Sequence, residues 1–286
     1  MSSETQTTAL TISILHEDAD LLIVDKPAGL VVHPAYKHPD GTLFDVVSAY
    51  LQERGETRPC LLHRLDKETS GAVMLAKTER ARRHLVRQFE QHTIRKTYLA
   101  LVCGRLTPPD GRIDAPLCRD PADRRRMHVN PLGDHAQTEY QTLKVCSDGR
   151  FSLVELHPIT GRMHQLRVHL AALNTPVVGD SLYAASDRWT PLAPARLCLH
   201  ARQLLFQHPA SGEWVSVIAP LPDDMQSILA SGIPSEEASG DKQIVQTQAH
   251  YHLPDWHTSG LAQERTSIPQ TYEHKEKGYN FGNHQP

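Results

Sequence analysis

The stretch LLHRLDKETSGAVMLAKT places Arg64 and Asp66 directly before a short apolar run over residues 71–76. Such a run is typical of a buried strand. A carboxylate beside a core is costly unless it has a partner, so Asp66 needs an ion pair or a chemical task. An extended backbone would point Arg64 and Asp66 to one face, while Leu65 turns the other way into the core. The stretch therefore predicts a charged pair at the edge of a site.

Asp66 has a plain structural alternative. A nearby guanidinium favours the charged form of a carboxyl group, so an ordinary ion pair would be enough to hold Asp66 at the edge of a core. Taken alone, the tripeptide favours such a structural ion pair, with Arg64 or Arg167 as the partner.

Metal chemistry has little support in the sequence. His157, His164 and His169 are candidate ligands, but the spacing of five between the last two does not stack imidazoles on one helix face as i, i+4 does. The five cysteines are odd in number and include no Cys-x-x-Cys pair, so neither a disulfide framework nor a zinc site is expected, and a reducing cytoplasm suits them.

The elements that must position these residues alternate between strands and short helices. We expect strands over residues 21–24, 71–76, 96–104, 137–146, 151–158, 196–207 and 213–220, with a further extended run over 30–33. A helix begins after Thr42, which forms a capping box with Asp45, and a second begins after Thr78. A third helix is expected over residues 162–173, and a long irregular connection over 105–133. Strands outnumber helices and several are joined by hairpins, which predicts an α+β fold with a mostly antiparallel, mixed sheet and flanking short helices.

Charge is distributed unevenly along the chain. The net charge is −3, yet residues 1–60 hold 4 basic and 9 acidic residues, whereas residues 77–126 hold 13 basic and 6 acidic ones. Opposite charges in different parts of one chain favour an oriented anionic partner. The triplet Arg124-Arg125-Arg126 in a long loop favours nucleic acid, against the alternative of a solvated polar loop.

Composition also divides the chain into segments. Residues 231–286 hold hardly any apolar clusters and cannot bury enough surface to offset chain entropy, so we expect a disordered tail, with a folded extra module as the alternative. We expect a flexible N-terminus over residues 1–11, followed by one domain over 12–230 that carries the candidate site. No targeting signal or run of membrane-spanning length is visible.

The stretch HRLDKETSG, from His63 to Gly71, resembles the signature of the RluA-type RNA pseudouridine synthases. Four further stretches, DKPAGLVVHP, RKTYLALVCG, PITGRMHQLRVHL and GDSLY, recur in the family's order and approximate spacing, so that the resemblance covers residues 12–222. It implies isomerisation of uridine to pseudouridine in RNA, without cofactor or metal, on a mixed sheet with a central active-site cleft. The chain most resembles the short form, because its N-terminus is too short for the S4 domain that many relatives carry.

Residue by residue, the resemblance implies that Asp66 is the catalytic aspartate, Tyr98 the active-site tyrosine and Arg167 the basic partner of the aspartate. Tyr98 lies in a predicted strand and combines an apolar ring for stacking with a hydroxyl. The resemblance makes it the expected base for a proton on C2′ if the route runs through a glycal, and a core aromatic is the alternative. Arg64 matches the arginine that enters the base stack where the uridine leaves. His164 is expected to support the RNA backbone or the hydrogen bonding of the site.

The implied partner is structured RNA, with large-subunit ribosomal RNA as the first expectation and transfer RNA as the second. Phosphate contacts are expected at Arg124, Arg125 and Arg126. We expect a monomer in the cytoplasm. Two alternatives stay open: an RNA-binding or ribosome-assembly factor that keeps the fold without using its chemistry, and a nucleotide hydrolase, which would release free uracil.

Overall fold

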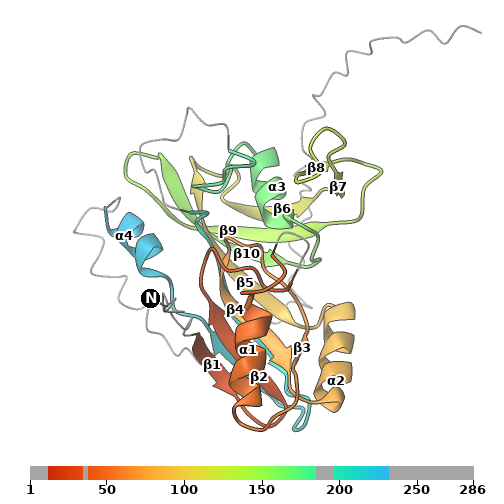
Figure 1. Ribbon diagram of the computed structural model, residues 1–286. Helices are drawn as coiled ribbons and strands as arrows, with labels where there is room; N and C mark the ends of the chain where they lie inside the picture. The colour runs from red at the N-terminus through yellow and green to blue at the C-terminus, as the bar shows by residue number, and fades with distance from the viewer. Residues whose placement is uncertain (1–11, 35–37, 185–195, 232–286) are drawn as a thin grey trace, which may run out of the picture.

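The computed structural model describes residues 12–34, 38–184 and 196–231, and these form a ten-stranded mixed sheet, a two-stranded hairpin and four helices (Figure 1). The strands of the large sheet are β1 (Ser13–Glu17), β2 (Leu21–Lys26), β3 (Cys60–Leu61), β4 (Ser70–Ala76), β5 (Arg95–Cys103), β6 (Asp110–Asp114), β9 (Gln137–Val145), β10 (Phe151–Pro158), β11 (Leu199–Gln207) and β12 (Trp214–Ile218). The hairpin consists of β7 (Leu117–Arg119) and β8 (Met127–Val129), and the helices are α1 (Leu43–Gln52), α2 (Glu79–Glu90), α3 (Gln165–Ala172) and α4 (Asp223–Ser231).

The large sheet has the strand order β1-β2-β4-β11-β5-β10-β9-β6, with β12 added to β11 and β3 added to β4. Its pairings are antiparallel except that of β4 with β11, which is parallel and short. The expected α+β fold with a mostly antiparallel, mixed sheet is confirmed. The parallel pair lies in the middle of the sheet and joins its two halves.

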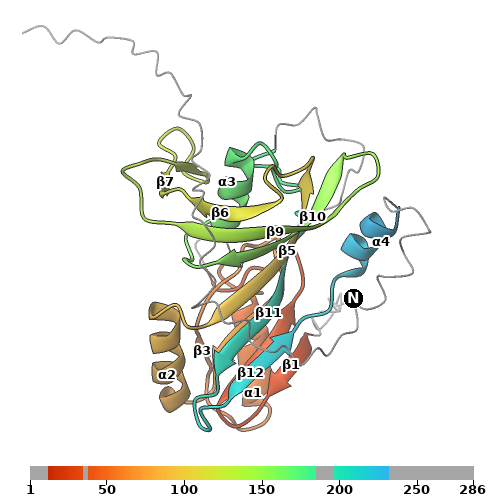
Figure 2. The ribbon, with the colours of Figure 1, turned by 180° about the vertical axis from the view of Figure 1, so that it is seen from behind.

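Helices cover both faces of each half of the sheet, as the alternation of side chains along the strands requires. On β4, Val73 faces the core cluster under α1, and Met74 faces the cluster under α2. On β5, Ala100 faces the cluster under α3, and Leu101 faces the cluster under α4, which is in front in Figure 2. Tyr98 packs against both the α1 and the α3 clusters, so the two halves meet at this residue on one face of the sheet.

The starts of α1 and α2 are confirmed at the expected residues. Thr42 caps α1, and the amide of Thr42 donates in return to the Asp45 carboxylate at 3.0 Å, which completes the capping box. Thr78 caps α2 by accepting from the amide of Ala81 at 3.1 Å. Each cap satisfies an amide that has no partner within the helix and contributes about 1 kcal/mol. The apolar run before α2 is also confirmed, because every residue of β4 is buried.

Two expected elements differ in the structure. Residues 30–33 are not a strand; the carbonyls of Val31 and Val32 instead accept from the first amides of α1, those of Leu43 and Phe44, at 2.8 and 3.1 Å. The third helix begins at residue 165 and not at 162, because His164 has a left-handed backbone, with φ of 53°.

The irregular connection expected over residues 105–133 holds three short strands, β6, β7 and β8. These strands have three to five residues each and little apolar alternation, so their stability comes from pairing and not from a local pattern. Helix α4 was not expected either, and it buries Met225 at the end of the domain. The N-terminus over residues 1–11, expected to be flexible, and, apart from Ser231 at the end of α4, the expected tail over 231–286 lie outside the described residues.

Candidate active site

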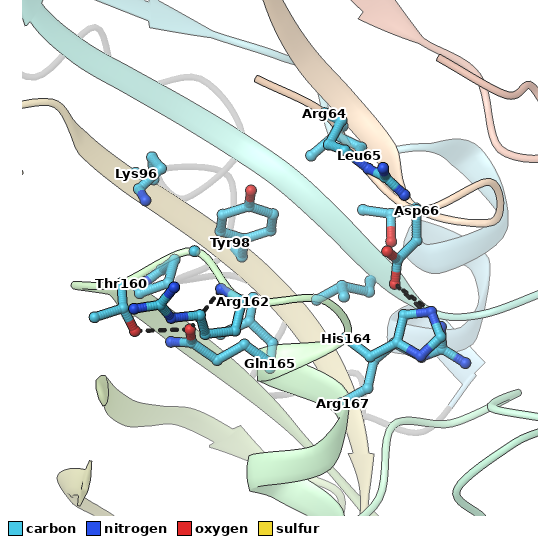
Figure 3. A pocket seen from close by; sticks show the side chains of 15 residues that line it. Arg64, Leu65, Asp66, Lys96, Tyr98, Thr160, Arg162, His164, Gln165 and Arg167 are labelled. Carbon is cyan, nitrogen blue, oxygen red and sulfur yellow. Dashed lines mark hydrogen bonds and ion pairs between the residues drawn. The ribbon is translucent and has the colours of Figure 1, made fainter. Parts of the chain in front are cut away.

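The loop between β3 and β4 carries the charged tripeptide to the wall of a pocket (Figure 3). Leu65 is 7% exposed and packs into the cluster under α1, whereas Arg64 is exposed. The side chains of Arg64 and Asp66 both line the pocket, which confirms that the two charges share one site.

A buried lysine side chain holds the loop between β3 and β4 in place. Lys26, at the end of β2, is fully buried, and its Nζ donates to the carbonyls of Pro27 and Leu30 at 2.8 Å each and of Lys67 at 3.0 Å. Burial lowers the pKa of Lys26 to about 8, and the charges of nearby Glu68 and Asp66 oppose that shift. Lys26 thus joins the turn after β2 to the residue that follows Asp66. Only its position in DKPAGLVVHP marked it in the sequence.

Gly71 permits the close approach that brings the loop to the centre of the sheet. Its φ is 111°, and a Cβ atom there would lie 2.3 Å from the carbonyl oxygen of Ala201 on β11. Only glycine adopts this conformation without strain. Ala201 pairs with Gly71 on one side and with Tyr98 of β5 on the other. Ala201 of β11 therefore lies between β4, the strand that follows Asp66, and β5, the strand that carries Tyr98.

Asp66 forms the expected ion pair with Arg167 of α3. Arg167 Nη1 donates to Asp66 Oδ2 at 3.0 Å, across 101 residues of sequence. The rest of the guanidinium is held by Asp180, which accepts from Nε at 2.7 Å and from Nη2 at 2.8 Å in a bidentate arrangement. Burial lowers the pKa of Arg167, but the hydrogen bonds and charges of Asp180 and Asp66 outweigh it and raise that pKa above its ordinary value. The cation is thereby permanent and fixed beside Asp66.

Asp180 is a site residue that sequence reasoning did not single out, although it lies in the stretch GDSLY. Its side chain has no exposed surface, and it also accepts from the amides of Leu182 and Tyr183 at 2.9 and 3.1 Å. These bonds fix the orientation of the carboxylate that holds Arg167. An aspartate on a turn can be recognised as the partner of a buried arginine only when that arginine is already known.

Tyr98 lies in the middle of the pocket, between Asp66 and the opposite wall (Figure 3). Burial raises the pKa of the Tyr98 phenol above its usual range, and the charge of Asp66 adds to the effect. The phenol is therefore protonated at neutral pH. The ring offers an apolar face to a planar ligand, as an aromatic stacking residue must.

His164 faces the same carboxylate oxygen as Arg167. Its Nε2 lies 3.9 Å from Asp66 Oδ2, and its Nδ1 lies 2.8 Å from the hydroxyl of Tyr183. Burial lowers the pKa of His164 and the charge of Arg167 lowers it further, whereas the charge of Asp66 opposes the shift. The imidazole is thus neutral at neutral pH and belongs to the carboxylate side of the pocket.

The wall opposite Asp66 is formed by Lys96, two residues before Tyr98, and by the turn before α3. Thr160 Oγ1 and the amide of Arg162 both donate to Gln165 Oε1, at 2.7 and 2.9 Å, which makes the turn rigid. Burial lowers the pKa of Lys96, whose Nζ has no hydrogen-bond or ion-pair partner within the described part of the chain. The sequence showed Lys96 only as one of many basic residues. Its place in the pocket suits a donor to a ligand oxygen.

The arginine triplet lies in the loop between β7 and β8, and its three members differ. Arg125 makes a bidentate pair with Asp123, at 2.9 and 2.7 Å. The Arg126 guanidinium lies 5.4 Å from the centre of the Tyr183 ring, beside the site. The exposed Arg124 guanidinium has no such partner among the described residues. Of the triplet, Arg124 is the member most available for a phosphate.

The other histidines considered as metal ligands have separate partners. His157 Nε2 lies 3.0 Å from the Glu155 carboxylate, and buried His169 contacts Thr138 and the carbonyl of Ala115. Within residues 12–34, 38–184 and 196–231, no group of three or more His, Cys, Asp or Glu side chains is arranged to hold a metal ion. No helix in these ranges is long and apolar enough to cross a membrane.

Comparison with known proteins matches the same region of the chain. A family model described as RNA pseudouridylate synthase matches residues 20–172. A relative from Chloroflexus aurantiacus, named an uncharacterized RNA pseudouridine synthase, is 47% identical over 72% of this chain and 64% of its own length. Ribosomal large subunit pseudouridine synthase D of Nitrosomonas europaea is 42% identical over 78% of this chain and 66% of its own length. The chain thus spans slightly less than two thirds of both relatives.

A solved structure extends the match to the fold. The human protein RNA Pseudouridylate Synthase Domain Containing 4 superposes with a TM-score of 0.63 at 31% sequence identity, and the match covers 76% of this chain and 92% of that protein. The resemblance drawn from five short stretches is thereby confirmed by sequence and by structure.

Proposed function

Because the chain belongs to the RNA pseudouridylate synthase family of isomerases, we propose that it converts specific uridines of structured RNA to pseudouridine. The observation that carries the proposal is the pocket in which Arg167, itself held by Asp180, fixes the Asp66 carboxylate opposite Tyr98. The reaction breaks the C1′–N1 bond, turns the uracil and forms a C1′–C5 bond, and the proton on C5 is replaced by one on N1.

Asp66 is the residue that we propose acts on the sugar. As N1 leaves with the bonding electrons, C1′ becomes electron-poor, and an adjacent carboxylate can bond to it or stabilise it. This requires the ionised form, and the carboxylate accepts a hydrogen bond of 3.0 Å from the permanent cation of Arg167. The bond that Asp66 makes is broken again when C5 attacks C1′, so the carboxylate is regenerated and no co-reactant is consumed.

Tyr98 is proposed to stack on the uracil while it turns. A ring face binds a planar base in any rotation about its normal, which suits a base that must present first N1 and then C5. A base role for Tyr98 at C2′ would need the phenolate, which burial and the Asp66 charge disfavour. The protonation state therefore supports the stacking role more strongly than the base role.

Arg64 is proposed to fill the space that the flipped uridine leaves in the RNA stack. Its exposed guanidinium lies on the wall of the pocket, two residues from Asp66, and a planar cation can stack on bases and donate to the unpaired partner. Arg64→Ala should slow the reaction by about 5- to 150-fold, the equivalent of about 1 to 3 kcal/mol for one stacked base.

A substrate with the target uridine already unpaired separates this role from that of Asp66. Such RNA should restore most of the rate lost in Arg64→Ala and none of the rate lost in Asp66→Asn. If it restores neither variant, Arg64 is a charge partner of Asp66 and has no part in flipping.

Large-subunit ribosomal RNA is the proposed first target and transfer RNA the second, since one relative is named for the ribosomal large subunit. We further propose that the protein acts as a monomer in the cytoplasm and without a cofactor, because the isomerisation has no net redox or group transfer. Pseudouridines should be mapped across the transcriptome with and without the gene. Defined positions should disappear and return with the wild-type gene but not with Asp66→Asn. An unchanged map would contradict the proposed function.

A further inference from the structure

The hydroxyl of Tyr183 lies between a fixed donor and an imidazole nitrogen. The backbone amide of Met127, the first residue of β8, donates to the Tyr183 oxygen at 2.8 Å. His164 Nδ1 lies 2.8 Å from the same oxygen. The function proposed above uses neither Tyr183 nor the direction of these bonds.

The direction of the bonds selects one tautomer of His164. The amide of Met127 can only donate, so the Tyr183 oxygen accepts there and has one proton of its own to give. Within the described residues, His164 Nδ1 is the acceptor that the structure provides for that proton. Nδ1 must then be unprotonated, and because the neutral ring carries one proton, that proton lies on Nε2.

The protonated Nε2 faces Asp66. It lies 3.9 Å from Oδ2, the oxygen to which Arg167 Nη1 donates at 3.0 Å. Catalytic hydrogen bonds are often long before the substrate is bound and shorten in the complex. No protein group of the described chain hydrogen-bonds the other oxygen, Oδ1. Arg167 thus holds Oδ2, the Nε2–H of His164 faces the same oxygen, and Oδ1 is left for the substrate.

We propose that Tyr183 is a positioning residue that holds His164 as the Nε2–H tautomer, so that His164 and Arg167 together anchor Asp66 Oδ2 and Asp66 Oδ1 is the oxygen that bonds to the sugar. The assignment of the attacking oxygen rests on the function proposed above; the tautomer does not. His164 is then a donor to the carboxylate, and a contact of its ring with the RNA backbone is not required.

The charges around His164 agree with a neutral ring. The groups that face it are Asp66 and Asp180, which favour protonation, and Arg167 and Arg64, which oppose it. Burial acts in the same direction as the two arginines, and the outcome is a pKa below the ordinary value. A protonated ring would donate from both nitrogens and would need the Tyr183 proton to point elsewhere, away from any acceptor in the described residues.

The Tyr183 ring itself is fixed by two cations. The guanidinium carbons of Arg126 and Arg167 lie 5.4 and 5.1 Å from its centre. A guanidinium is attracted to the face of an aromatic ring at such a distance, so both contacts favour this ring position. Tyr183→Phe keeps these contacts and removes the hydroxyl alone. The variant therefore tests the hydrogen bond from Tyr183 to His164 without disturbing the position of the ring.

The tautomer can be measured without any reaction. The protein should be labelled with 15N at histidine, and the signals of His164 assigned as those that disappear in the spectrum of His164→Asn. At neutral pH these signals should show an unprotonated Nδ1 and a protonated Nε2. Tyr183→Phe should give a mixture of both tautomers. A protonated Nδ1 in the wild-type protein, or an unchanged tautomer in Tyr183→Phe, would overturn the proposal whether or not the protein modifies RNA.

A double-mutant cycle tests the consequence for catalysis. Single-turnover rates with saturating RNA should fall about 2- to 10-fold in Tyr183→Phe, as for one lost hydrogen bond, with the Kd for RNA unchanged. His164→Asn tolerates the left-handed backbone but ends short of Asp66. In that background Tyr183→Phe should cost no further rate. Equal losses in both backgrounds, or none in the wild-type background, would show that Tyr183 does not act through His164. Thermal unfolding checks that all variants are folded.

Discussion

Asp180→Asn tests whether the catalytic carboxylate is positioned through a buried ion pair. Asp180 holds Arg167 by two hydrogen bonds of 2.7 and 2.8 Å, and the side chains of Asp180 and Arg167 are 0% and 9% exposed. An amide has one acceptor oxygen, so its NH₂ group would face a guanidinium N–H. The arginine remains charged and buried, with Asp66 as its remaining anion.

The magnitude follows from this geometry. Removing one partner of a buried ion pair costs about 3 to 5 kcal/mol. We expect about 3 kcal/mol, because the side-chain amide of the variant keeps one acceptor and Asp66 stays beside Nη1. For a domain of this size the melting temperature should fall by about 6 to 12 °C. Since Arg167 would no longer be fixed, the single-turnover rate should fall about 10- to 100-fold.

Asp224→Asn is the matched control. Asp224 makes the same bidentate contact with Arg196, at 2.5 and 2.7 Å, but its side chain is 47% exposed. The free energy of unfolding should change by less than about 1 kcal/mol, and the rate should not change. Urea unfolding and calorimetry measure both variants. If Asp180→Asn loses no more stability than Asp224→Asn, burial of the Arg167–Asp180 pair does not stabilise the site.

Two further predictions concern pH and salt. Burial lowers the pKa of His169 and His200 to about 4, against about 6.5 when unfolded, so below pH 6.5 the unfolded chain binds protons that the folded one does not. Urea unfolding should therefore show a free energy that falls between pH 6.5 and 4, by up to about 1.4 kcal/mol per pH unit for each histidine; a flat profile would contradict burial of neutral rings. Arg124→Ala should flatten the slope of log binding constant against log salt by about 0.7 in filter-binding titrations, and Arg125→Ala by less, because Asp123 already pairs with Arg125. Equal slopes would contradict this difference.

Much of the fold could be predicted because the local signals are strong. β4 is apolar from Gly71 to Ala76, and Thr42 with Asp45 marks the start of α1 by hydrogen bonds within one turn. The strands β6, β7 and β8 could not be predicted, since they are short and are stabilised by pairing with distant strands or with each other. The left-handed backbone of His164 could not be predicted either, because a residue other than glycine in this conformation leaves no pattern in the sequence.

The candidate site could be predicted in part, where its residues lie in local sequence motifs. The motifs marked Asp66 and Arg167, and the structure places them 3.0 Å apart. Asp180 and Lys26 act through partners that only the tertiary fold supplies, so no local pattern distinguishes them from other aspartates and lysines. The Asp123–Arg125 pair is different: an aspartate two residues before an arginine in a polar loop was visible, and it marks that arginine as already paired.

The central claim is that the ionised Asp66 carboxylate does the chemistry, and Asp66→Asn tests it most directly. Asparagine keeps the shape of the side chain and removes the charge that Arg167 holds at 3.0 Å. Purified wild-type and variant proteins should be mixed with a saturating amount of a mapped target RNA, and pseudouridine and free uracil quantified in a single turnover. We expect no pseudouridine from Asp66→Asn, no free uracil from either protein, and RNA binding within a few-fold of the wild type. Pseudouridine formation by Asp66→Asn at the wild-type rate would contradict the account.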